Sequence, residues 1–454
     1  MKFLVLFLLF IPLSLVAIVK HNIPLTPPLG FNSWTAFECE MDCINHPDDC
    51  INEQLFKDIA DIMKKEGYSD AGYKYVNIDD CWLANNRTDQ GKLSPNQTRF
   101  PSGIRKLSDY IHKQGLKFGV YADVGMKTCA RFPGSFGYFE IDAKTFEEWN
   151  IDYIKMDGCF IEDDQLEYAH VEMGKALTSL KNQIIYMCEW PYELWKVNKT
   201  ANYTEVSKVC NIWRNYKDVR NHWDTVRDVI DYMVENQDVL ASVHGPAALN
   251  DPDMLVIGNE NITVEMAKTQ FTVWCIWSAP LLISTDLRKI DQKFKEILLN
   301  REAIAINQDS MVKFGKVVKK EKDILYFVKE INPVIEGKMS YAIAVVNMNE
   351  NVTHKYIMKI SKLGLDNERG YVVTNIWKSH RKSEKIKPRN YIAGRLPPAG
   401  SLFIKLIAIG STTNDSDKTN QSASSNNSYN GLLDAMLRFN PLNLFDRNHY
   451  LDEK

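Results

Sequence analysis

Residues 116–157 read LKFGVYADVGMKTCARFPGSFGYFEIDAKTFEEWNIDYIKMD, and this stretch decides the fold. It opens and closes with short runs rich in β-branched and aromatic residues, 116–123 and 152–157, and a helical pattern covers 143–149 between them. The pattern predicts a strand, a helix and a second strand. Both predicted strands end in an aspartate.

The same alternation of strand and helix extends over about residues 24–320. Further helices are expected at 104–113 and 165–180. The strand candidates of this part are 28–30, 73–80, 116–123, 152–157, 183–190, 211–215, 254–258 and 280–285. About eight strands in about 300 residues are typical of a (β/α)8 TIM barrel, an α/β fold. A doubly wound sheet is the main alternative, but the Gly-rich phosphate turn that usually follows its first strand is absent from the sequence.

After about residue 322, apolar residues alternate with polar ones instead of recurring at helical spacing. Strands are expected at 324–328, 341–346, 355–360, 371–377 and 401–407. Residues 322–408 therefore predict a small antiparallel β-sandwich domain. Ser, Thr and Asn make up 14 of the 20 residues from 411 to 430, which is too polar to bury a core. We expect 410–454 to be a low-complexity, disordered tail.

The N-terminus has the pattern of a signal peptide. Lys2 precedes an apolar run over 3–16, and the small residue Ala17 follows it. We therefore expect residues 1–17 to direct the chain into the secretory pathway, to a lysosome or outside the cell, and to be cleaved. A membrane anchor would need about 20 apolar residues, which this run does not reach. No other stretch of the sequence could span a bilayer.

The balance of charge argues against nucleic acid as a partner. Lys and Arg number 55 against 58 Asp and Glu, which leaves a formal net charge of -3 at pH 7. A chain without net positive charge has no long-range attraction for phosphate backbones or anionic lipid.

The nine cysteines are expected to form disulfides, because a secreted chain folds in an oxidising compartment and the Cys-x-x-Cys spacing of zinc sites is absent. Eight can pair, in an order that the sequence leaves open, and one must remain. Cys275 lies within the apolar run 271–279 and is expected to be a buried free thiol. Nine Asn-x-Ser/Thr acceptors agree with a glycosylated luminal protein: Asn86, Asn96, Asn198, Asn202, Asn261, Asn351, Asn414, Asn420 and Asn426.

Several predicted strands finish in acidic side chains, which makes their carboxyl ends the expected place of chemistry. These acids are Asp79, Asp80, Asp123, Asp157 and Glu189. In a (β/α)8 barrel the strand ends share one face, so the carboxylates would converge on one pocket. Burying several carboxylates together costs free energy unless a ligand, a metal or a catalytic role offsets it.

Three chemistries use clustered carboxylates. A divalent-metal site is not favoured, because neither a calcium loop nor a His-Glu-x-x-His motif is present. Phosphoryl transfer is not favoured either, since Gly125-Met126-Lys127-Thr128 lacks the adjacent Gly-Lys pair of a phosphate loop. Glycoside hydrolysis fits best, because it needs two carboxyls at the scissile bond, further acids for sugar hydroxyls and aromatic faces for the ring. No metal and no organic cofactor is expected.

The acidic strand ends belong to longer blocks that follow one another over about residues 25–308. These are Pro28-Leu29-Gly30-Phe31-Asn32-Ser33-Trp34, Asn77-Ile78-Asp79-Asp80-Cys81-Trp82, Tyr121-Ala122-Asp123-Val124-Gly125, Pro133-Gly134-Ser135-Phe136-Gly137, Lys155-Met156-Asp157-Gly158-Cys159, Arg214-Asn215 and Asn250-Asp251-Pro252-Asp253-Met254-Leu255. In this order the blocks resemble the α-galactosidase and α-N-acetylgalactosaminidase family of retaining glycosidases, glycoside hydrolase family 27, and its animal lysosomal members in particular. The resemblance implies an α-galactoside substrate and, by analogy with animal relatives, a homodimer.

The resemblance also implies the two catalytic carboxyls. Asp157, in the block Lys-x-Asp-Gly-Cys, would be the nucleophile that attacks the anomeric carbon. Asp218, four residues after Arg214, would protonate the leaving oxygen and later activate water, with the two carboxyls about 5 to 5.5 Å apart. Lys155 and Arg214 are expected to keep Asp157 ionised. Asp218 would need surroundings that hold its proton.

The remaining site residues follow from the same resemblance. Trp34 would stack on the sugar, and the others would bind its hydroxyls or complete the pocket: Asp79, Asp80, Tyr121, Lys155, Glu189, Tyr192, Arg214 and Asp253. Four disulfides are implied as well, Cys39 with Cys81, Cys43 with Cys50, Cys129 with Cys159, and Cys188 with Cys210. That pairing leaves Cys275 alone.

The block Cys188-Glu189-Trp190-Pro191-Tyr192 bears on the choice of sugar. In this family, galactosamine-preferring animal members have Ser and Ala where galactose-preferring members have Glu and a bulky residue. Glu189 can accept a hydrogen bond from a 2-hydroxyl, and Tyr192 would fill the space that an acetamido group needs, so we expect an α-galactosidase. An α-N-acetylgalactosaminidase is the near alternative. A galactose-binding protein without turnover is the alternative from a different class.

Two departures from the family pattern lie near the expected pocket. Ala247-Ala248-Leu249 stands where the family has Gly-Gly-Trp, and Glu193 stands where animal relatives usually have Tyr. They leave the affinity and the preference for the aglycone open.

Overall fold

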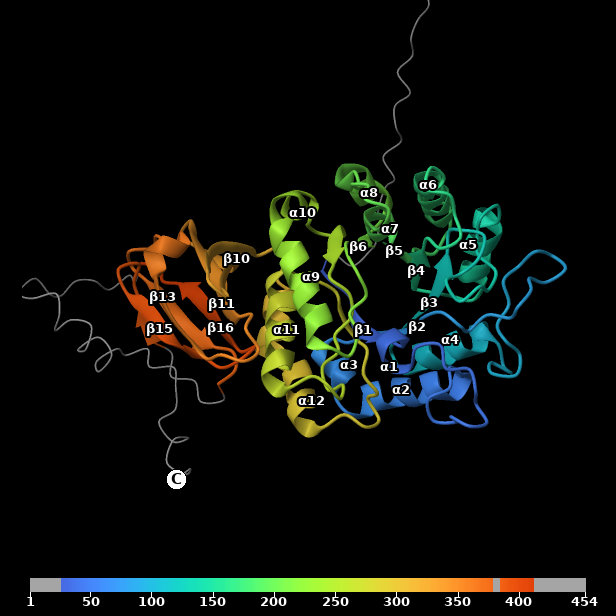
Figure 1. The fold of residues 1–454 in the computed structure, drawn as a ribbon, viewed down its shortest axis with the longest axis horizontal. Coiled ribbons are helices and arrows are strands. Elements are labelled where there is room, and N and C mark those ends of the chain that lie inside the picture. Colours follow the sequence, from blue (N-terminus) through green and yellow to red (C-terminus); the bar gives the residue numbers. More distant parts are fainter. Residues whose placement is uncertain (1–25, 379–383, 412–454) are drawn as a thin grey trace, which may run out of the picture.

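The computed structural model describes residues 26–378 and 384–411. A strand–helix region and a region of antiparallel strands lie at opposite ends of its longest axis (Figure 1). The predicted signal peptide, 1–17, and all but the first two residues of the predicted tail, 410–454, lie outside the described residues.

Eight parallel strands form one sheet in the order β7-β6-β5-β4-β3-β2-β1-β8. Their bounds are β1 Leu29–Asn32, β2 Tyr75–Ile78, β3 Lys117–Asp123, β4 Tyr153–Asp157, β5 Ile185–Cys188, β6 Ile212–Arg214, β7 Leu249–Asp251 and β8 Leu281–Ile283. β1 pairs with β2 and also with β8. An isolated parallel bridge between Leu255 and Ile283 brings the segment after β7 against β8. The predicted (β/α)8 barrel is confirmed.

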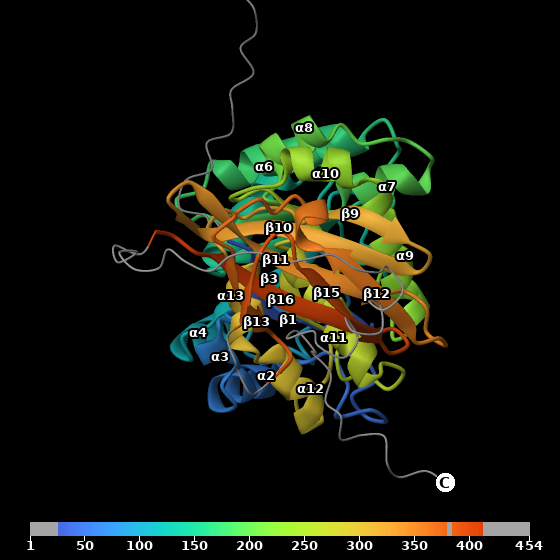
Figure 2. The ribbon, with the colours of Figure 1, turned by 90° about the vertical axis from the view of Figure 1, so that its left-hand side faces the viewer.

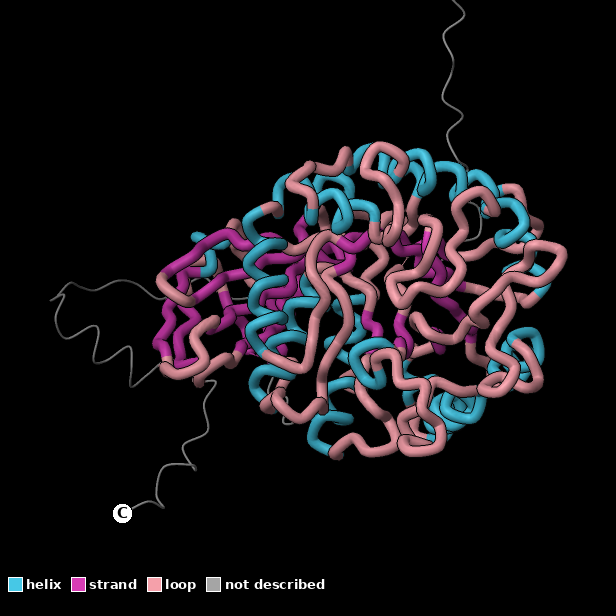
Figure 3. The backbone as a smooth tube through the Cα atoms, turned by 45° about the vertical axis from the view of Figure 1, so that its right-hand side comes forward, coloured by secondary structure: helices cyan, strands magenta, loops and turns pink. Residues whose placement is uncertain are grey.

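Helices surround this sheet (Figure 3). They are α1 Trp34–Phe37, α2 Glu53–Lys65, α3 Tyr68–Ala71, α4 Ile104–Lys113, α5 Phe139–Glu148, α6 Leu166–Thr178, α7 Trp190–Lys196, α8 Tyr203–Val209, α9 Trp223–Glu235, α10 Gln237–Val243, α11 Val264–Ile276, α12 Gln292–Leu298 and α13 Arg301–Asn307. α2 shows why they form. Asn52 caps it by accepting a hydrogen bond from the Leu55 amide at 2.9 Å, and Leu55, Ile59 and Met63 bury one face.

Alternate residues of the barrel strands face two different cores. Tyr153 and Ile185 belong to a cluster inside the barrel, whereas Ile154 and Tyr186, the next residues along the same strands, belong to the larger cluster that includes the helices. Both faces of these strands are buried, as expected for a parallel sheet covered by helices. Polar side chains are thus concentrated at the strand ends.

The seventh strand differs from the prediction. β7 is Leu249–Asp251, and the predicted segment 254–258 forms no strand. Asp253, between them, has a φ of 75°, which takes the chain out of strand geometry. Leu255 keeps one bridge to β8, and most of the segment is buried. Its apolar composition therefore reflects burial, while the real strand is too short and polar to be recognised.

The antiparallel region faces the viewer in Figure 2. One sheet has the order β14-β13-β16-β11-β10-β9, and β12 pairs with β15 in a second sheet. The bounds are β9 Lys316–Glu321, β10 Ile324–Ile335, β11 Lys338–Asn347, β12 His354–Lys359, β13 Tyr371–Asn375, β14 Glu384–Ile386, β15 Tyr391–Leu396 and β16 Ser401–Ala408. Side chains of both sheets share one core, among them Tyr326, Ile343, Tyr356 and Ile392. The predicted antiparallel β domain is confirmed.

Three strands of this region, β9, β14 and β15, were not predicted. β9 is a largely exposed edge strand with the sequence KVVKKE, so charged residues replace the alternating pattern. It begins before residue 322, the first residue of the predicted β domain.

Lys329 of β10 joins the two regions. Its buried ammonium donates to the carbonyl oxygens of Cys275 at 3.0 Å and Ile306 at 2.5 Å, and to Ser278 Oγ at 2.7 Å. The two carbonyls belong to the last turns of α11 and α13, where acceptors lack helical partners. One side chain of the β domain therefore donates hydrogen bonds to the C-terminal ends of two barrel helices.

Candidate active site

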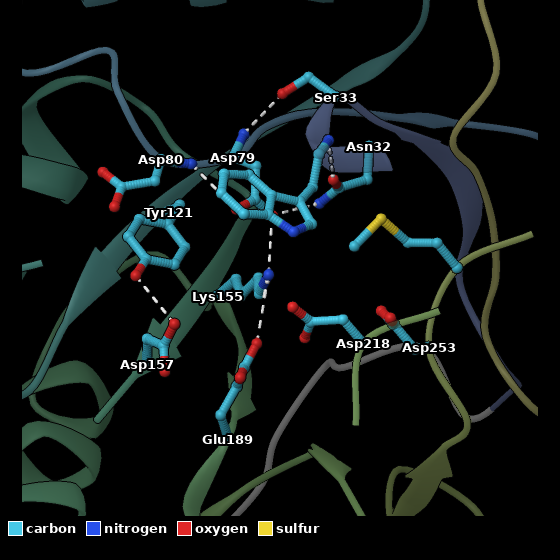
Figure 4. Close-up of polar contacts among 12 residues, drawn as sticks. Asn32, Ser33, Asp79, Asp80, Tyr121, Lys155, Asp157, Glu189, Asp218 and Asp253 are labelled. Carbon is cyan, nitrogen blue, oxygen red and sulfur yellow. Dashed lines mark hydrogen bonds and ion pairs between the residues drawn. The ribbon is translucent and has the colours of Figure 1, made fainter. Parts of the chain in front are cut away.

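The carboxyl ends of the barrel strands bring the sequence-predicted site residues together (Figure 4). Asp79 and Asp80 follow β2, Tyr121 lies in β3, Lys155 and Asp157 lie in β4, Glu189 follows β5, Arg214 ends β6, Asp218 comes after it and Asp253 follows β7. Trp34 begins α1, directly after β1, and Tyr192 lies in α7, directly after β5. All of them thus lie at the same end of the barrel.

Two buried cations hold most of the acids in one network. Lys155 Nζ lies 2.8 Å from Asp79 Oδ2 and 3.2 Å from Glu189 Oε1. Arg214 forms ion pairs with the acids that follow β5, β6 and β7: Glu189 at 2.5 Å, Asp218 at 2.8 Å and Asp253 at 2.8 Å. Burial alone would lower the pKa of each cation, but these carboxylates raise it, so both remain charged.

Asp157 is held by neutral donors. The Tyr121 hydroxyl donates to Asp157 Oδ2 at 2.9 Å, and the amide of Gly158 donates to Oδ1 at 2.8 Å. Within the described part of the chain, no cationic nitrogen lies within 4.0 Å of this carboxylate. The residue is only 8% exposed. Its orientation is therefore fixed, while its charge is left without a close partner.

Asp218 is the most accessible acid of the network. Its side chain is 24% exposed, against 4% or less for its partners Arg214 and Asp253. It also receives a hydrogen bond from the Trp34 side chain. In Figure 4 the Asp157 and Asp218 carboxyls lie on either side of the Lys155 side chain. Of the acids in the network, Asp218 is therefore the one that solvent reaches most easily.

The order of charge differs from the sequence-based expectation. Burial raises the pKa of Asp157 well above its ordinary value, and the charges of Glu189 and Glu193 raise it further against the opposing effect of Lys155. Burial also acts to raise the pKa of Asp218, but Arg214 overrides it and the pKa lies below the ordinary value. The physical reason is the pairing. Both cations are engaged by other acids, so in the free site Asp157 keeps its proton to higher pH than Asp218 does.

The sugar-binding candidates have well-defined partners. Asp79 accepts a hydrogen bond from Asn32 Nδ2 at 3.0 Å, and Asp80 accepts one from the Ala130 amide at 2.9 Å. The Arg214 guanidinium lies 5.2 Å from the ring centroid of Tyr192. Glu189 and Tyr192 therefore lie close together, because both contact Arg214.

Two further acids of the site were missed by the sequence reasoning as functional groups. Burial, aided by Asp253, raises the pKa of Asp251 to about 7, and Asp251 Oδ1 accepts the Asp253 amide at 2.8 Å. Glu193 has one carboxylate oxygen within 4.8 Å of oxygens of Asp157 and Glu189. The sequence offered one indication for each residue. Asp251 lies in one of the blocks that resemble the family, and Glu193 departs from the family pattern.

Four disulfides have the pairing that the resemblance implied: Cys39 with Cys81, Cys43 with Cys50, Cys129 with Cys159, and Cys188 with Cys210. Cys275 is free and buried. Three of the bonds involve a cysteine next to a site acid or two residues from one: Cys81 after Asp80, Cys159 after Asp157 and Cys188 before Glu189. They brace the ends of β2, β4 and β5.

Two groups of side chains are close enough to share a cation, but their chemistry does not suit one. The first contains Asp123, Cys129, Asp157 and Cys159, and both sulfurs are consumed in a disulfide. The second is Asp157, Glu189 and Glu193, where Lys155, Arg214 and Lys196 already supply positive charge. We derive no metal chemistry from either group.

A family model described as alpha galactosidase A matches residues 26–309. The chain belongs to the α-galactosidase and α-N-acetylgalactosaminidase family, glycoside hydrolase family 27. Among its relatives, human alpha-galactosidase A is 40% identical over 76% of this chain and 80% of its own. The chicken (Gallus gallus) alpha-N-acetylgalactosaminidase is 38% identical over 79% of this chain and 88% of its own. Crystalline alpha-galactosidase I from Mortierella vinacea has a TM-score of 0.75 at 27% identity, covering 86% of this chain and 99% of its own.

Membership of family 27 makes the chain a glycoside hydrolase. The matched residues include the whole acid cluster from Asp79 to Asp253. The disulfides are typical of the secretory pathway. In the described ranges, none of the helices has the length and apolar character needed to cross a bilayer.

Proposed function

We propose that the chain is a retaining α-galactosidase that removes terminal α-D-galactosyl residues from glycolipids, oligosaccharides or glycoproteins. The family establishes a glycosidase for terminal α-galactosyl or α-N-acetylgalactosaminyl groups. The observation that supports galactose is the shared contact of Glu189 and Tyr192 with Arg214. It puts a carboxylate and an aromatic ring in one corner, which suits a 2-hydroxyl and leaves little room for an acetamido group.

The proposed reaction is a double displacement. Asp157 attacks the anomeric carbon while Asp218 gives its proton to the glycosidic oxygen, which releases the aglycone as an alcohol and leaves a β-galactosyl ester on Asp157. Asp218 then takes a proton from water, the water oxygen attacks the same carbon, and the ester bond to Asp157 breaks. Two inversions give α-galactose with net retention. Tyr121 and Gly158 orient the attacking carboxylate through their hydrogen bonds.

The first displacement needs a proton on Asp218 and none on Asp157, the opposite of the order that the free site favours. A bound sugar and aglycone would displace water from the partly exposed Asp218 and so favour its neutral form. The developing positive charge at the anomeric carbon would favour the ionised form of Asp157. Substrate binding is therefore part of the proposed activation of the two carboxyls.

Two aryl substrates test the choice of sugar. We expect kcat/KM at acidic pH to be higher for an aryl α-galactoside than for the matching N-acetyl-α-galactosaminide. Tyr192→Ala should raise the relative kcat/KM of the acetamido substrate about tenfold or more, because it opens the space beside Arg214. The control is Tyr168→Ala, since Tyr168 is a 53% exposed tyrosine of α6. A wild-type preference for the acetamido sugar would favour the α-N-acetylgalactosaminidase alternative instead.

The location and assembly are part of the same proposal. Delivery to a lysosome or outside the cell agrees with the disulfides and with an N-terminal signal peptide. A homodimer follows only from analogy with animal relatives. A galactose-binding protein without turnover remains the alternative from another class, and it would bind galactose while releasing no product from an aryl α-galactoside.

A further inference from the structure

Glu193 of α7 places a third carboxyl beside the proposed nucleophile. One of its oxygens lies within 4.8 Å of a carboxylate oxygen of Asp157 and of one of Glu189. Gly158 makes this approach feasible, because a Cβ atom at position 158 would lie only 2.8 Å from Glu193 Cγ. The glycine that follows the nucleophile thus leaves the space in which the Glu193 side chain lies.

The partners of Glu193 differ from those of its neighbours. Lys196 lies 2.6 Å from Glu193 Oε2, and the lysine side chain is 38% exposed. Glu193 itself is 8% exposed, and its Oε1 is buried without a hydrogen-bond partner among the described residues. Glu189, in contrast, contacts both buried cations. Of the three neighbouring acids, Glu189 is therefore the one paired with Lys155 and Arg214, whereas Asp157 and Glu193 lack these partners and compete for a proton.

Several elements contribute charged or titratable groups around Glu193. They are Lys196, Glu189 and Tyr192 on or next to α7, Asp157 on β4, Asp123 on β3 and Arg214 on β6. Two of the surrounding cations, Arg214 and Lys196, are paired with carboxylates, and the remaining neighbours are acids or a neutral phenol. An additional negative charge at Glu193 thus acts on Asp157, and the partly exposed Lys196 offsets it only in part.

We propose that Glu193 is a positioning residue that controls the ionisation of Asp157, because its negative charge, when present, opposes the loss of the proton from Asp157. This inference rests on the proposed function, in which ionised Asp157 is the nucleophile. Glu193 would act through Asp157 and not by contact with the reacting atoms. Glu193 is one of the positions at which this chain departs from the family pattern, because animal relatives usually have Tyr there.

Electrostatics gives the direction of the effect. Burial raises the pKa of Glu193 to about 7, against the opposing effect of Lys196, so Glu193 gains its charge as the pH rises towards neutral. The charge of Glu193, when present, raises the pKa of Asp157. Activity that requires ionised Asp157 is lost as the pH falls through the pKa of that group. Removing the Glu193 charge lowers this pKa and should move the acid limb of the pH profile to lower pH.

The test is the pH profile of kcat for Glu193→Gln on an aryl α-galactoside, because kcat reports the ionisation of the substrate-bound enzyme. We expect the acid limb to move to lower pH by about one pH unit, as for two charges about 5 Å apart in a partly screened site. The matched control is Glu205→Gln, because Glu205 forms an ion pair of the same spacing with Lys208 on exposed α8, and its limb should not move. A uniform loss of kcat with an unmoved limb, or a shift of the limb to higher pH, would overturn the proposal.

A second readout is independent of turnover. Infrared difference spectra of the full chain between acidic and neutral pH should contain a protonated-carboxyl band that is lost in Glu193→Gln. If the wild type hydrolyses no α-galactoside, the proposed function fails. The infrared band still decides whether Glu193 holds a proton. A Glu193→Gln spectrum identical to that of the wild type would overturn the inference. If Glu193→Gln does not fold by circular dichroism, Glu193→Tyr, which restores the residue usual in animal relatives, should show the same lower limb, and an unmoved limb would again count against the proposal.

Discussion

Asp157→Asn is expected to lower kcat on an aryl α-galactoside by about 10⁴-fold or more, with little change in the binding of free galactose. The amide has nearly the shape of the carboxylate: its oxygen can accept the hydrogen bond of the Gly158 amide, and its NH2 group can donate to the Tyr121 hydroxyl oxygen. It cannot form the galactosyl ester, so the proposed first displacement stops. The measurement is the release of nitrophenol together with equilibrium binding of galactose.

The control for this change is Asp163→Asn, in the same loop after β4. Asp163 pairs with Lys199 at 3.2 Å, its side chain is 49% exposed, and its replacement should leave kcat unchanged. A second variant, Asp157→Gly, leaves room for azide as an external nucleophile, and one inversion should then give β-galactosyl azide. Turnover that persists undiminished in Asp157→Asn would disprove the nucleophile assignment. A wild type without turnover would favour the binding-protein alternative.

Asp218→Asn is expected to have an effect that depends on the leaving group. A methyl or sugar aglycone needs a proton to depart, so kcat/KM should fall about 10³-fold on such substrates. A dinitrophenyl aglycone departs as a stable anion, so the first displacement should lose about tenfold or less. The comparison of the two substrates isolates the acid role from a loss of folding, because a misfolded variant loses both activities equally.

Asp224→Asn serves as the control for Asp218→Asn, since Asp224 is a 69% exposed acid paired with Arg227 on the next helix, α9. Equal losses on the two kinds of substrate would contradict the acid assignment. The pH profile offers a further check. Arg214 opposes protonation of Asp218, so in the substrate-bound enzyme the proton for the leaving group should be lost early as the pH rises, and wild-type kcat should have an acidic optimum.

The barrel was predictable because most of its strands end in a charged residue or are directly followed by one, and most are apolar runs. The run at 116–123 corresponds to β3, and the helix expected at 104–113 coincides with α4. β7 was not predictable, because only three residues pair there and two of them, Asn250 and Asp251, are polar. Edge strand β9 was missed for a related reason, since an exposed strand needs no apolar alternation.

The site residues also differ in how well the sequence predicts them. Asp157 ends β4 and Glu189 directly follows β5, so periodicity alone points to them. Asp218 lies in a loop after β6, and nothing in its local sequence separates it from a surface acid; the family resemblance was needed. The order of charge could not be read from the sequence at all. It depends on which acids reach Arg214 and Lys155, and that depends on the positions of five different strand ends.

The disulfides at the ends of β2, β4 and β5 have a consequence for how the protein can be made. A bacterial cytosol keeps thiols reduced. A recombinant chain produced there could therefore form its barrel while the segments next to Asp80, Asp157 and Glu189 lacked their disulfides. Soluble yield would then overstate the amount of active enzyme. Maturation in the endoplasmic reticulum, with its oxidants and isomerases, is in this sense a step in assembling the catalyst.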